Sequence, residues 1–355
     1  MNLTKQKGEI LITFGPRILK TGLAVTLSIY VCMVFGLEHG VFAGVAAILA
    51  IQPSVYRTWK QLLDQIITNT LGASISLFFI YFFGEHPIII GFVIILMISI
   101  SIKLKMETTI PLTLVTVIAI MGATGSEDVS FAIERFFVIL IGTITAIMIN
   151  ITIFPPNYKK KFTEDLQKTF QHMSLLMRTA ISDEMREASY QDIHQKFQSD
   201  LTKLQDQFKL LDEERSKLGK STKLNARELI VLKQMIKAFQ EAHHLLACIE
   251  DHYFQSQPVK SETTLFDEKL EELVKYHEYL LLKYLGLIKE DHNMIGFKIL
   301  DNQDAFYSNV LEKSEEDKEQ KLRQTIIASS IVHYSFHLER LEKVILQYIG
   351  NEVRK

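Results

Sequence analysis

The chain has 355 residues and a mass of 40.8 kDa, which is enough for two or three domains. Its net charge of −2 argues against nucleic-acid binding, which relies on a basic surface. The only two cysteines, Cys32 and Cys248, lie in segments of different character. We therefore expect neither a disulfide framework nor a cysteine-based metal site.

Charged residues are distributed very unevenly along the chain. Residues 1–157 contain 9 Lys or Arg and 8 Asp or Glu, whereas residues 158–355 contain 30 and 33. At the border, residues 136–154 are uncharged and long enough to cross a hydrocarbon core of ~30 Å. Two prolines and then three lysines follow, as is typical of a membrane exit on the cytoplasmic side. The pattern predicts an all-α protein with a transmembrane domain over 1–157 and a cytoplasmic helical domain over 158–355.

The membrane part divides into apolar segments separated by Gly, Pro or charged residues. No small-residue cleavage site follows the first segment, so we expect a retained membrane helix and not a signal peptide. A polar stretch at 55–65 is interpreted as a link between the second and third helices. The predicted spans are residues 17–35, 41–51, 66–83, 88–102, 110–123 and 136–154. The second and fifth are short, and a four-span chain results if both are re-entrant.

The loops between these segments alternate in charge. Loops after the first, third and fifth segments carry acidic residues or His but no Lys or Arg, whereas the other loops are basic. By the positive-inside rule this predicts a multi-pass protein of the cell membrane with both termini in the cytoplasm. Beyond Lys159 the apolar residues recur at helical spacing. Expected helices of an antiparallel bundle are residues 159–185, 190–218, 225–254, 264–287 and 315–350.

Candidate ligand-binding residues lie near both ends of the membrane helices. Glu134 and Arg135 begin the sixth helix, where Arg135 either binds an anion or extends toward the outer headgroups. Lys20, close to Arg17 on the first helix, either belongs to a cationic inner vestibule or anchors the helix. Further candidate substrate-binding residues on the inner side are Gln52, Pro53, Ser54 and Asn150, although a buried amide also serves to bond helices together.

No catalytic or cofactor-binding pattern is found. His333 and His337 have the i, i+4 spacing of a zinc-binding helix, but the general-base Glu of a zinc protease is missing and the sequence identifies no third ligand. The Gly219-Lys220-Ser221-Thr222 run lacks the upstream Gly of a phosphate-binding loop. We therefore expect no catalytic residue, no metal, no cofactor and no enzyme activity.

Several short motifs resemble the aromatic acid exporter family. They comprise Arg17-x-x-Lys20-Thr21, Ala43-Gly44, Gln52-Pro53, Leu71-Gly72-Ala73 and Glu134-Arg135 followed by Gly142, Asn150 and Phe154-Pro155-Pro156. The chain is similar to the half-sized form of that family and, more distantly, to fusaric acid resistance proteins and aluminium-activated malate transporters. The resemblance implies efflux of aromatic or other small organic acids.

The predicted function is therefore transport of a small organic anion across a lipid membrane by a homo-oligomer, expected to be a dimer. Two alternatives stay open: an organic-anion channel, and a membrane-anchored regulatory protein whose helical domain binds a partner. Each set of three helices has a short middle helix with a proline at its cytoplasmic end (Pro53, Pro111). This arrangement is typical of an inverted repeat and predicts that the helices at 41–51 and 110–123 line the substrate path.

Overall fold

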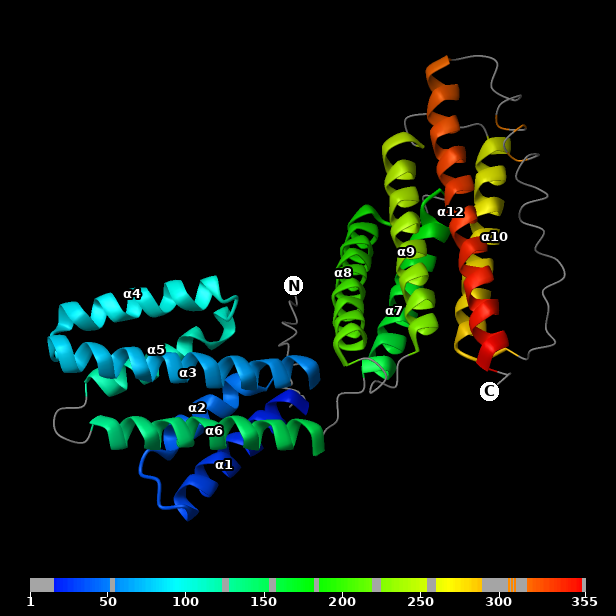
Figure 1. The fold of residues 1–355 in the computed structure, drawn as a ribbon. Coiled ribbons are helices and arrows are strands. Elements are labelled where there is room, and N and C mark those ends of the chain that lie inside the picture. Colours follow the sequence, from blue (N-terminus) through cyan, green and yellow to red (C-terminus); the bar gives the residue numbers. More distant parts are fainter. Residues whose placement is uncertain are drawn as a thin grey trace, which may run out of the picture. The chain divides into compact units, whose positions relative to one another are not determined.

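The computed structural model describes residues 16–51, 55–122, 128–152, 158–181, 185–218, 225–253, 260–288, 306, 308, 310 and 318–352. In these ranges the chain is all-α, as predicted, and its contacts divide it into two units, residues 1–156 and 157–355 (Figure 1). Each unit has its own buried core, so each is described separately.

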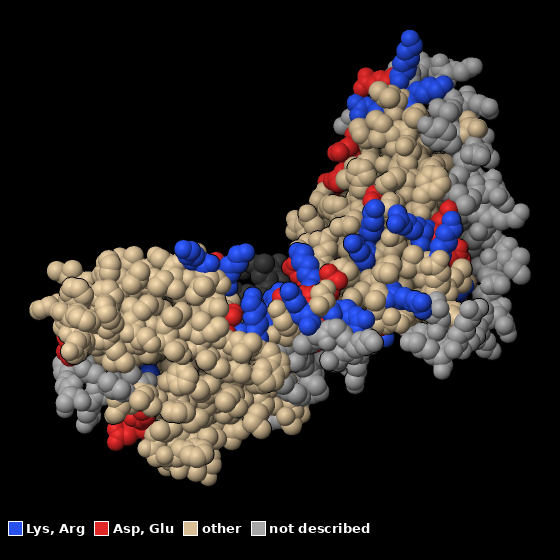
Figure 2. All heavy atoms as spheres, viewed as in Figure 1, with Lys and Arg blue, Asp and Glu red and all other residues tan. Residues whose placement is uncertain are grey.

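The first unit contains α1 (Pro16–Val34), α2 (Gly40–Ala50), α3 (Val55–Phe83), α4 (Pro87–Lys103), α5 (Ile110–Met121) and α6 (Asp128–Thr152). A short 3₁₀ turn, Glu107–Thr109, precedes α5, and Pro111 lies in the first turn of that helix, where a missing N–H is tolerated. On the side seen in Figure 2 its surface is mostly uncharged, with charged groups at the margins, as expected for a face that meets lipid. Residues 56–83 and 133–150 are long and apolar enough to cross a membrane, and the other apolar helices are shorter.

One prediction about this unit is wrong. The polar stretch at 55–65 is not a link, because it forms the first turns of α3, which runs without a break from Val55 to Phe83. It was misread because its polar residues were averaged over the whole segment. Its uncharged polar residues and Asp64 lie on one buried face, while the exposed face carries Trp59 and Leu63 together with Arg57 and Lys60.

The helices of the first unit pack in a pattern that repeats after three helices. α1 packs on α2 as α4 packs on α5, and α2 packs on α6 as α5 packs on α3. The pair α1–α6 likewise corresponds to α4–α3, while α3 and α6 contact each other. Each half therefore completes its packing with the third helix of the other half, as an internal repeat of three helices would.

Glycines occupy the corresponding close contacts of the two halves. A Cβ on Gly142 of α6 would collide with the backbone of Ala43 in α2. A Cβ on Gly72 of α3 would lie 3.0 Å from Thr113 Cγ2 and 3.3 Å from Val117 Cγ2, both in α5. Small residues allow helices to approach closely where no hydrophobic effect drives them together. Both short middle helices are therefore held against a glycine of a long one.

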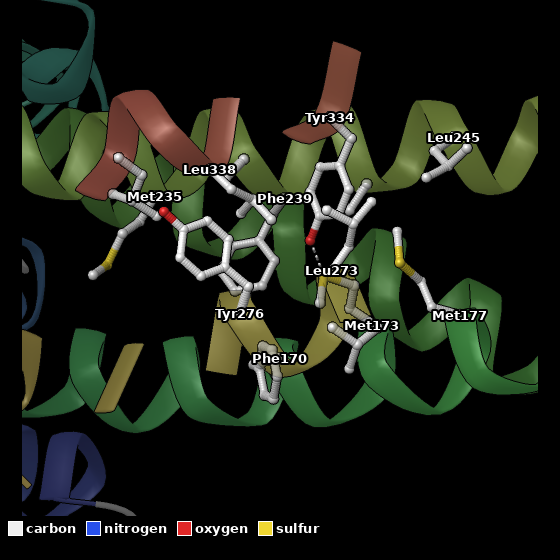
Figure 3. Packing of buried hydrophobic residues seen from close by; sticks show 14 of the residues in the cluster. Phe170, Met173, Met177, Met235, Phe239, Leu245, Leu273, Tyr276, Tyr334 and Leu338 are labelled. Atoms are coloured by element: carbon white, nitrogen blue, oxygen red, sulfur yellow. Dashed lines mark hydrogen bonds between the residues drawn. The ribbon is translucent and has the colours of Figure 1, made fainter. Parts of the chain in front are cut away.

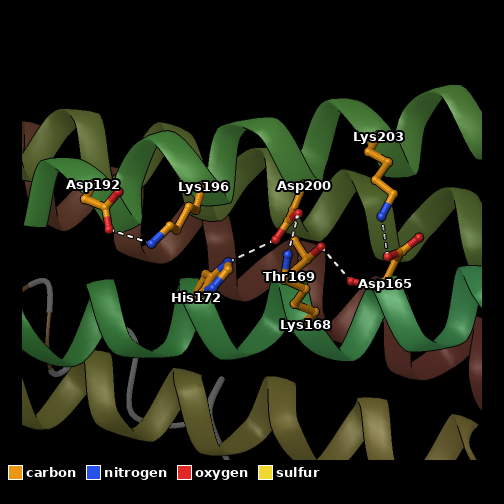
Figure 4. Close-up of polar contacts among 8 residues, drawn as sticks. All are labelled: Asp165, Lys168, Thr169, His172, Asp192, Lys196, Asp200 and Lys203. Carbon is orange, nitrogen blue, oxygen red and sulfur yellow. Dashed lines mark hydrogen bonds and ion pairs between the residues drawn. The ribbon is translucent and has the colours of Figure 1, made fainter. Parts of the chain in front are cut away.

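The second unit is a bundle of α7 (Tyr158–Thr179), α8 (Glu187–Leu218), α9 (Ala226–His252), α10 (Lys260–Tyr284) and α12 (Lys318–Glu352). Their apolar faces meet in one large core (Figure 3). On the α7–α8 face, Asp165 accepts hydrogen bonds of 2.6 Å from Lys203 and from Gln207, and Asp200 meets Lys168 and His172 (Figure 4). Burial of Asp165 disfavours its ionised form, but these hydrogen bonds outweigh that effect and lower its pKa.

The core of the bundle contains a buried histidine, His277, which lies 2.7 Å from the Tyr334 hydroxyl and packs against Phe170 and Phe239. Burial lowers the pKa of His277 to about 3, so the folded protein keeps this ring neutral. Below the unfolded pKa of ~6.5 the unfolded chain binds a proton that the folded chain does not. Burial of the neutral His277 ring therefore does not lower the free energy of unfolding above pH ~6.5. It lowers that free energy progressively as the pH falls toward 3.

We expect the variant His277→Gln to lose less stability on acidification than the parent. Between pH 6.5 and pH 5 the difference should approach ~2 kcal/mol, since each pH unit is worth ~1.4 kcal/mol. Thermal unfolding of both proteins, followed by circular dichroism at the two pH values, measures this difference. Equal pH dependence of the two melting temperatures would contradict a neutral, buried His277.

Candidate functional site

Buried polar side chains recur along one face of α3. Each of the following is 4% exposed or less, and all but the last are separated by one to four residues: Thr58, Gln61, Gln65, Thr68, Asn69 and Ser76. The carboxylate of Asp64, 8% exposed, lies among them. From Thr58 to Ser76 this polar face extends ~27 Å at 1.5 Å per residue, close to the thickness of a hydrocarbon core. Buried polar residues are costly in a membrane and mark functional or helix-bonding positions.

The polar face of α3 contacts α5 and the turn before it. Thr108 donates a hydrogen bond of 2.8 Å to Gln61 Oε1, and Thr116 Oγ1 lies 3.5 Å from Asn69 Oδ1. Two of its groups, Gln65 Nε2 and Ser76 Oγ, are buried and have no hydrogen-bond partner among the described residues. These groups can take a polar ligand without giving up an existing bond. Sequence analysis missed the face, although its three-and-four spacing is readable from residues 58–76.

Three helices meet at the start of this face. Lys20 of α1 donates a hydrogen bond of 3.1 Å to Asn150 Oδ1 of α6, and Asn150 Nδ2 lies 3.3 Å from Thr58 Oγ1 of α3. Lys20 and Asn150 were both predicted as site residues, and the structure brings them together. The Lys20 ammonium group therefore forms a contact between two helices of the unit, in addition to any role in anchoring α1 at the membrane surface. Of the other inner candidates, Gln52, Pro53 and Ser54 fall outside the described residues, as does the side chain of Arg17.

Arg135 lies near the opposite end of α6. At 1.5 Å per residue, the 15 positions from Arg135 to Asn150 correspond to ~22 Å. The Arg135 side chain is 1% exposed and its guanidinium lies over the ring of Phe42 in α2. All three of its nitrogens are buried without a hydrogen-bond partner in the described part of the chain. The side chain is therefore enclosed by helices of the first unit, and its hydrogen-bond donors are unused among the described residues.

Glu134, the neighbour of Arg135, has a separate environment. Its Oε1 accepts a hydrogen bond of 3.0 Å from the backbone N–H of Glu38 and lies 3.7 Å from His39 Nδ1. Glu134 thus fixes the turn between α1 and α2 and is directed away from the guanidinium. The predicted Glu134–Arg135 pair is split between two roles, since α6 presents consecutive side chains in directions ~100° apart.

α3 and α6 run side by side in opposite directions, because the start of α3 meets the end of α6 at Thr58 and Asn150 (Figure 1). The far end of the α3 face, with Ser76, is therefore at the same end of the unit as Arg135. The first unit thus has an ammonium near one end and a guanidinium near the other, and its α3 face carries buried hydroxyls, amides and the carboxylate of Asp64. Arg135 faces Phe42 of α2, whereas the polar face of α3 contacts α5 and, at Thr58, α6. The ammonium and the guanidinium are each groups that can bind a carboxylate.

Comparison with known proteins identifies relatives of this chain. Residues 12–153 match the family model described as "Aromatic acid exporter family member 1", and residues 109–223 match "Aluminium activated malate transporter". The UPF0421 protein YgaE of Bacillus subtilis (strain 168) is 31% identical over 343 residues, which is 94% of this chain and 95% of the relative. UPF0421 proteins of Bacillus thuringiensis (strain Al Hakam) and Bacillus cereus are 24% identical over 309 residues and 22% identical over 348 residues. The latter two alignments cover 83% and 95% of this chain and 82% and 95% of the relatives.

These matches confirm the resemblance seen in the sequence and place the protein in a membrane. They extend over the whole chain in the case of YgaE, with both units included. The chain belongs to the UPF0421 family, and residues 12–153 of its first unit are similar to the aromatic acid exporter family.

Proposed function

We propose that this protein exports small organic acids, aromatic acids among them, across the cell membrane. The observation that carries the proposal is Arg135, a guanidinium that is 1% exposed and has no hydrogen-bond partner among the described residues. A buried charge is strongly unfavourable unless it is paired, so a group of this kind marks an anion site. The planar fork of arginine binds a carboxylate through two parallel hydrogen bonds.

The path proposed for the substrate follows the buried polar face of α3. It extends from the Lys20–Asn150 end to Arg135, with the unpartnered groups of Gln65 and Ser76 along it. Each of these groups can bond a carboxylate or hydroxyl briefly and release it, which transport requires. The short helices α2 and α5 pack against α6 and α3 respectively, and in this proposal they border the path.

Topology and assembly belong to the same proposal. Six spans with both termini in the cytoplasm are supported by the alternation of loop charges. A homodimer is supported by the many large apolar side chains exposed on α1, which a second copy or lipid can cover: Ile18, Leu19, Leu23, Leu27, Tyr30, Met33 and Val34.

The experiment is flux of a radiolabelled aromatic carboxylate into vesicles that contain the purified full-length chain. Protease access to α7–α12 scores the orientation of each preparation. We expect saturable uptake that is accelerated by the same acid on the far side, because a carrier returns faster when loaded. Uptake that is not accelerated in this way and instead follows an imposed voltage indicates the channel alternative. No flux above protein-free vesicles contradicts transport and favours the membrane-anchored regulatory alternative.

A further inference from the structure

A cluster of metal-ligating side chains lies in the second unit, where α9 and α12 form the most extensively packed pair of helices. Its members are Glu241 on α9 and His333 and His337 on α12. His333 Nδ1 lies 3.1 Å from Glu241 Oε2, and His337 Nε2 lies 3.6 Å from Glu241 Oε1. One ligand atom from each residue can be chosen so that all three lie within 4.8 Å of one another.

This geometry is close to that of an occupied metal site. Zinc binds imidazole nitrogen and carboxylate oxygen at ~2.0–2.2 Å, so neighbouring ligand atoms are roughly 3.4 Å apart in a tetrahedron. The two carboxylate–imidazole separations, 3.1 and 3.6 Å, are near that spacing, but they involve different oxygens of Glu241. Rotation of the carboxylate and closer approach of the two imidazoles, which belong to adjacent turns of α12, would bring one ligand atom of each residue to a common ion.

Each of the two histidines also presents a ring nitrogen to the carboxylate, and one of them lies at the surface. His337 Nδ1 is buried and has no partner in the described ranges. The other ring nitrogen, Nε2, faces Glu241 and is therefore the atom that would bind the metal. The His333 side chain is 57% exposed, so the site is open to solvent and an ion can enter.

We propose that Glu241, His333 and His337 form a binding site for a divalent transition metal, with Zn²⁺ the best match. Two imidazoles and one carboxylate are the ligand set of zinc sites that keep a fourth position for water. Imidazole ligands disfavour Mg²⁺ and Ca²⁺, which prefer oxygen. The bound ion would join α12 to α9 and stabilise the bundle. This proposal is independent of the transported substrate.

Two cationic side chains, Lys237 and Arg340, act on His337 and oppose a cation there. Both are exposed, so water and salt screen them and their long side chains can turn away. These two charges weaken metal binding, but they do not occupy the ligand atoms of Glu241, His333 and His337.

The test is equilibrium dialysis of the full-length chain, without a polyhistidine tag, against Zn²⁺ alone, with metal content measured by mass spectrometry. We expect one Zn²⁺ per chain and a melting temperature that rises with Zn²⁺ concentration. Co²⁺ in place of Zn²⁺ should give the visible absorption bands of a site with four or five ligands. His333→Ala and Glu241→Gln should each weaken Zn²⁺ binding by more than about tenfold, because even residues that only hydrogen-bond to the ligands contribute that much to metal affinity.

His172→Ala is the matched control, because His172 also contacts a carboxylate, Asp200, at 3.0 Å but belongs to no such cluster. It should bind Zn²⁺ as the parent does. His333 is exposed and Gln has the shape of Glu, so both test variants should fold, which circular dichroism verifies. The proposal is overturned by the absence of stoichiometric binding, or by binding that persists in His333→Ala and Glu241→Gln.

Discussion

Replacing Arg135 with lysine should lower the kcat/KM for organic-acid flux by roughly 10- to 150-fold. The reason is geometric: lysine keeps the positive charge but loses the planar fork that holds a carboxylate by two hydrogen bonds. A hydrogen bond to a charged group is worth about 1.5–3 kcal/mol, which sets this range. Arg135→Ala removes the charge as well and should lower flux further. The measurement is initial uptake of a labelled aromatic carboxylate by vesicles with matched amounts of protein.

Lys103→Ala is the control for a general effect of lost positive charge. Lys103 ends α4 and is exposed, in contrast to the buried Arg135. The control should transport as the parent does. If both Arg135 variants also carry parental flux at normal expression, the guanidinium is not on the substrate path and has a structural role only.

Gly142→Leu should abolish accumulation of folded protein, and Gly142→Ala should reduce it strongly. The Cβ added to Gly142 meets the carbonyl group and Cα of Ala43, so the obstacle is backbone and cannot rotate away. α6 must then move off α2, and the buried residues packed between them lose their contacts. Shortening Ala43 to Gly should not rescue the variant, because the collision is not with its side chain. Detergent-extracted yield and the elution profile on gel filtration report the result.

Gly91→Ala provides the matched control. Gly91 also lies inside an apolar helix, α4, but nothing lies within 4 Å of its added Cβ. Alanine forms helix more readily than glycine, so this variant should fold at least as well as the parent. Parental yield of Gly142→Ala would contradict the close approach of α6 to α2.

Much of the fold follows from the sequence. Apolar length and helical periodicity placed α1, α2, α4 and α5 to within two residues. They missed the first eight residues of α6, which begins at Asp128, and the first eleven of α3, which begins at Val55. There a polar stretch was assigned to the water phase because hydropathy averages over all faces of a helix. Burial is decided face by face, and α5 and α6 cover the polar face of α3. Six spans and their orientation stay predictions from loop charge.

The candidate site was only partly predictable. Residue type identified Lys20, Asn150 and Arg135, since charge and amide inside an apolar helix are conspicuous. The contact of Lys20 with Asn150 joins residues 130 positions apart, and no local pattern specifies such a pairing. The same holds for Glu241, which the sequence offered no reason to place beside His333 and His337 until α9 and α12 were packed together.

The exchange of third helices between the two halves has a consequence for biogenesis. α2 has 11 residues, ~16 Å of helix, which is about half the thickness of a hydrocarbon core. Its partner α6 is synthesised nearly a hundred residues later. Until then α2 can only remain at the translocon or pack against α1. An unpaired half-length helix leaves terminal backbone groups without partners in lipid, which is costly. Insertion of the first half is therefore reversible until α6 arrives, and the membrane unit becomes stable only when its last helix is made.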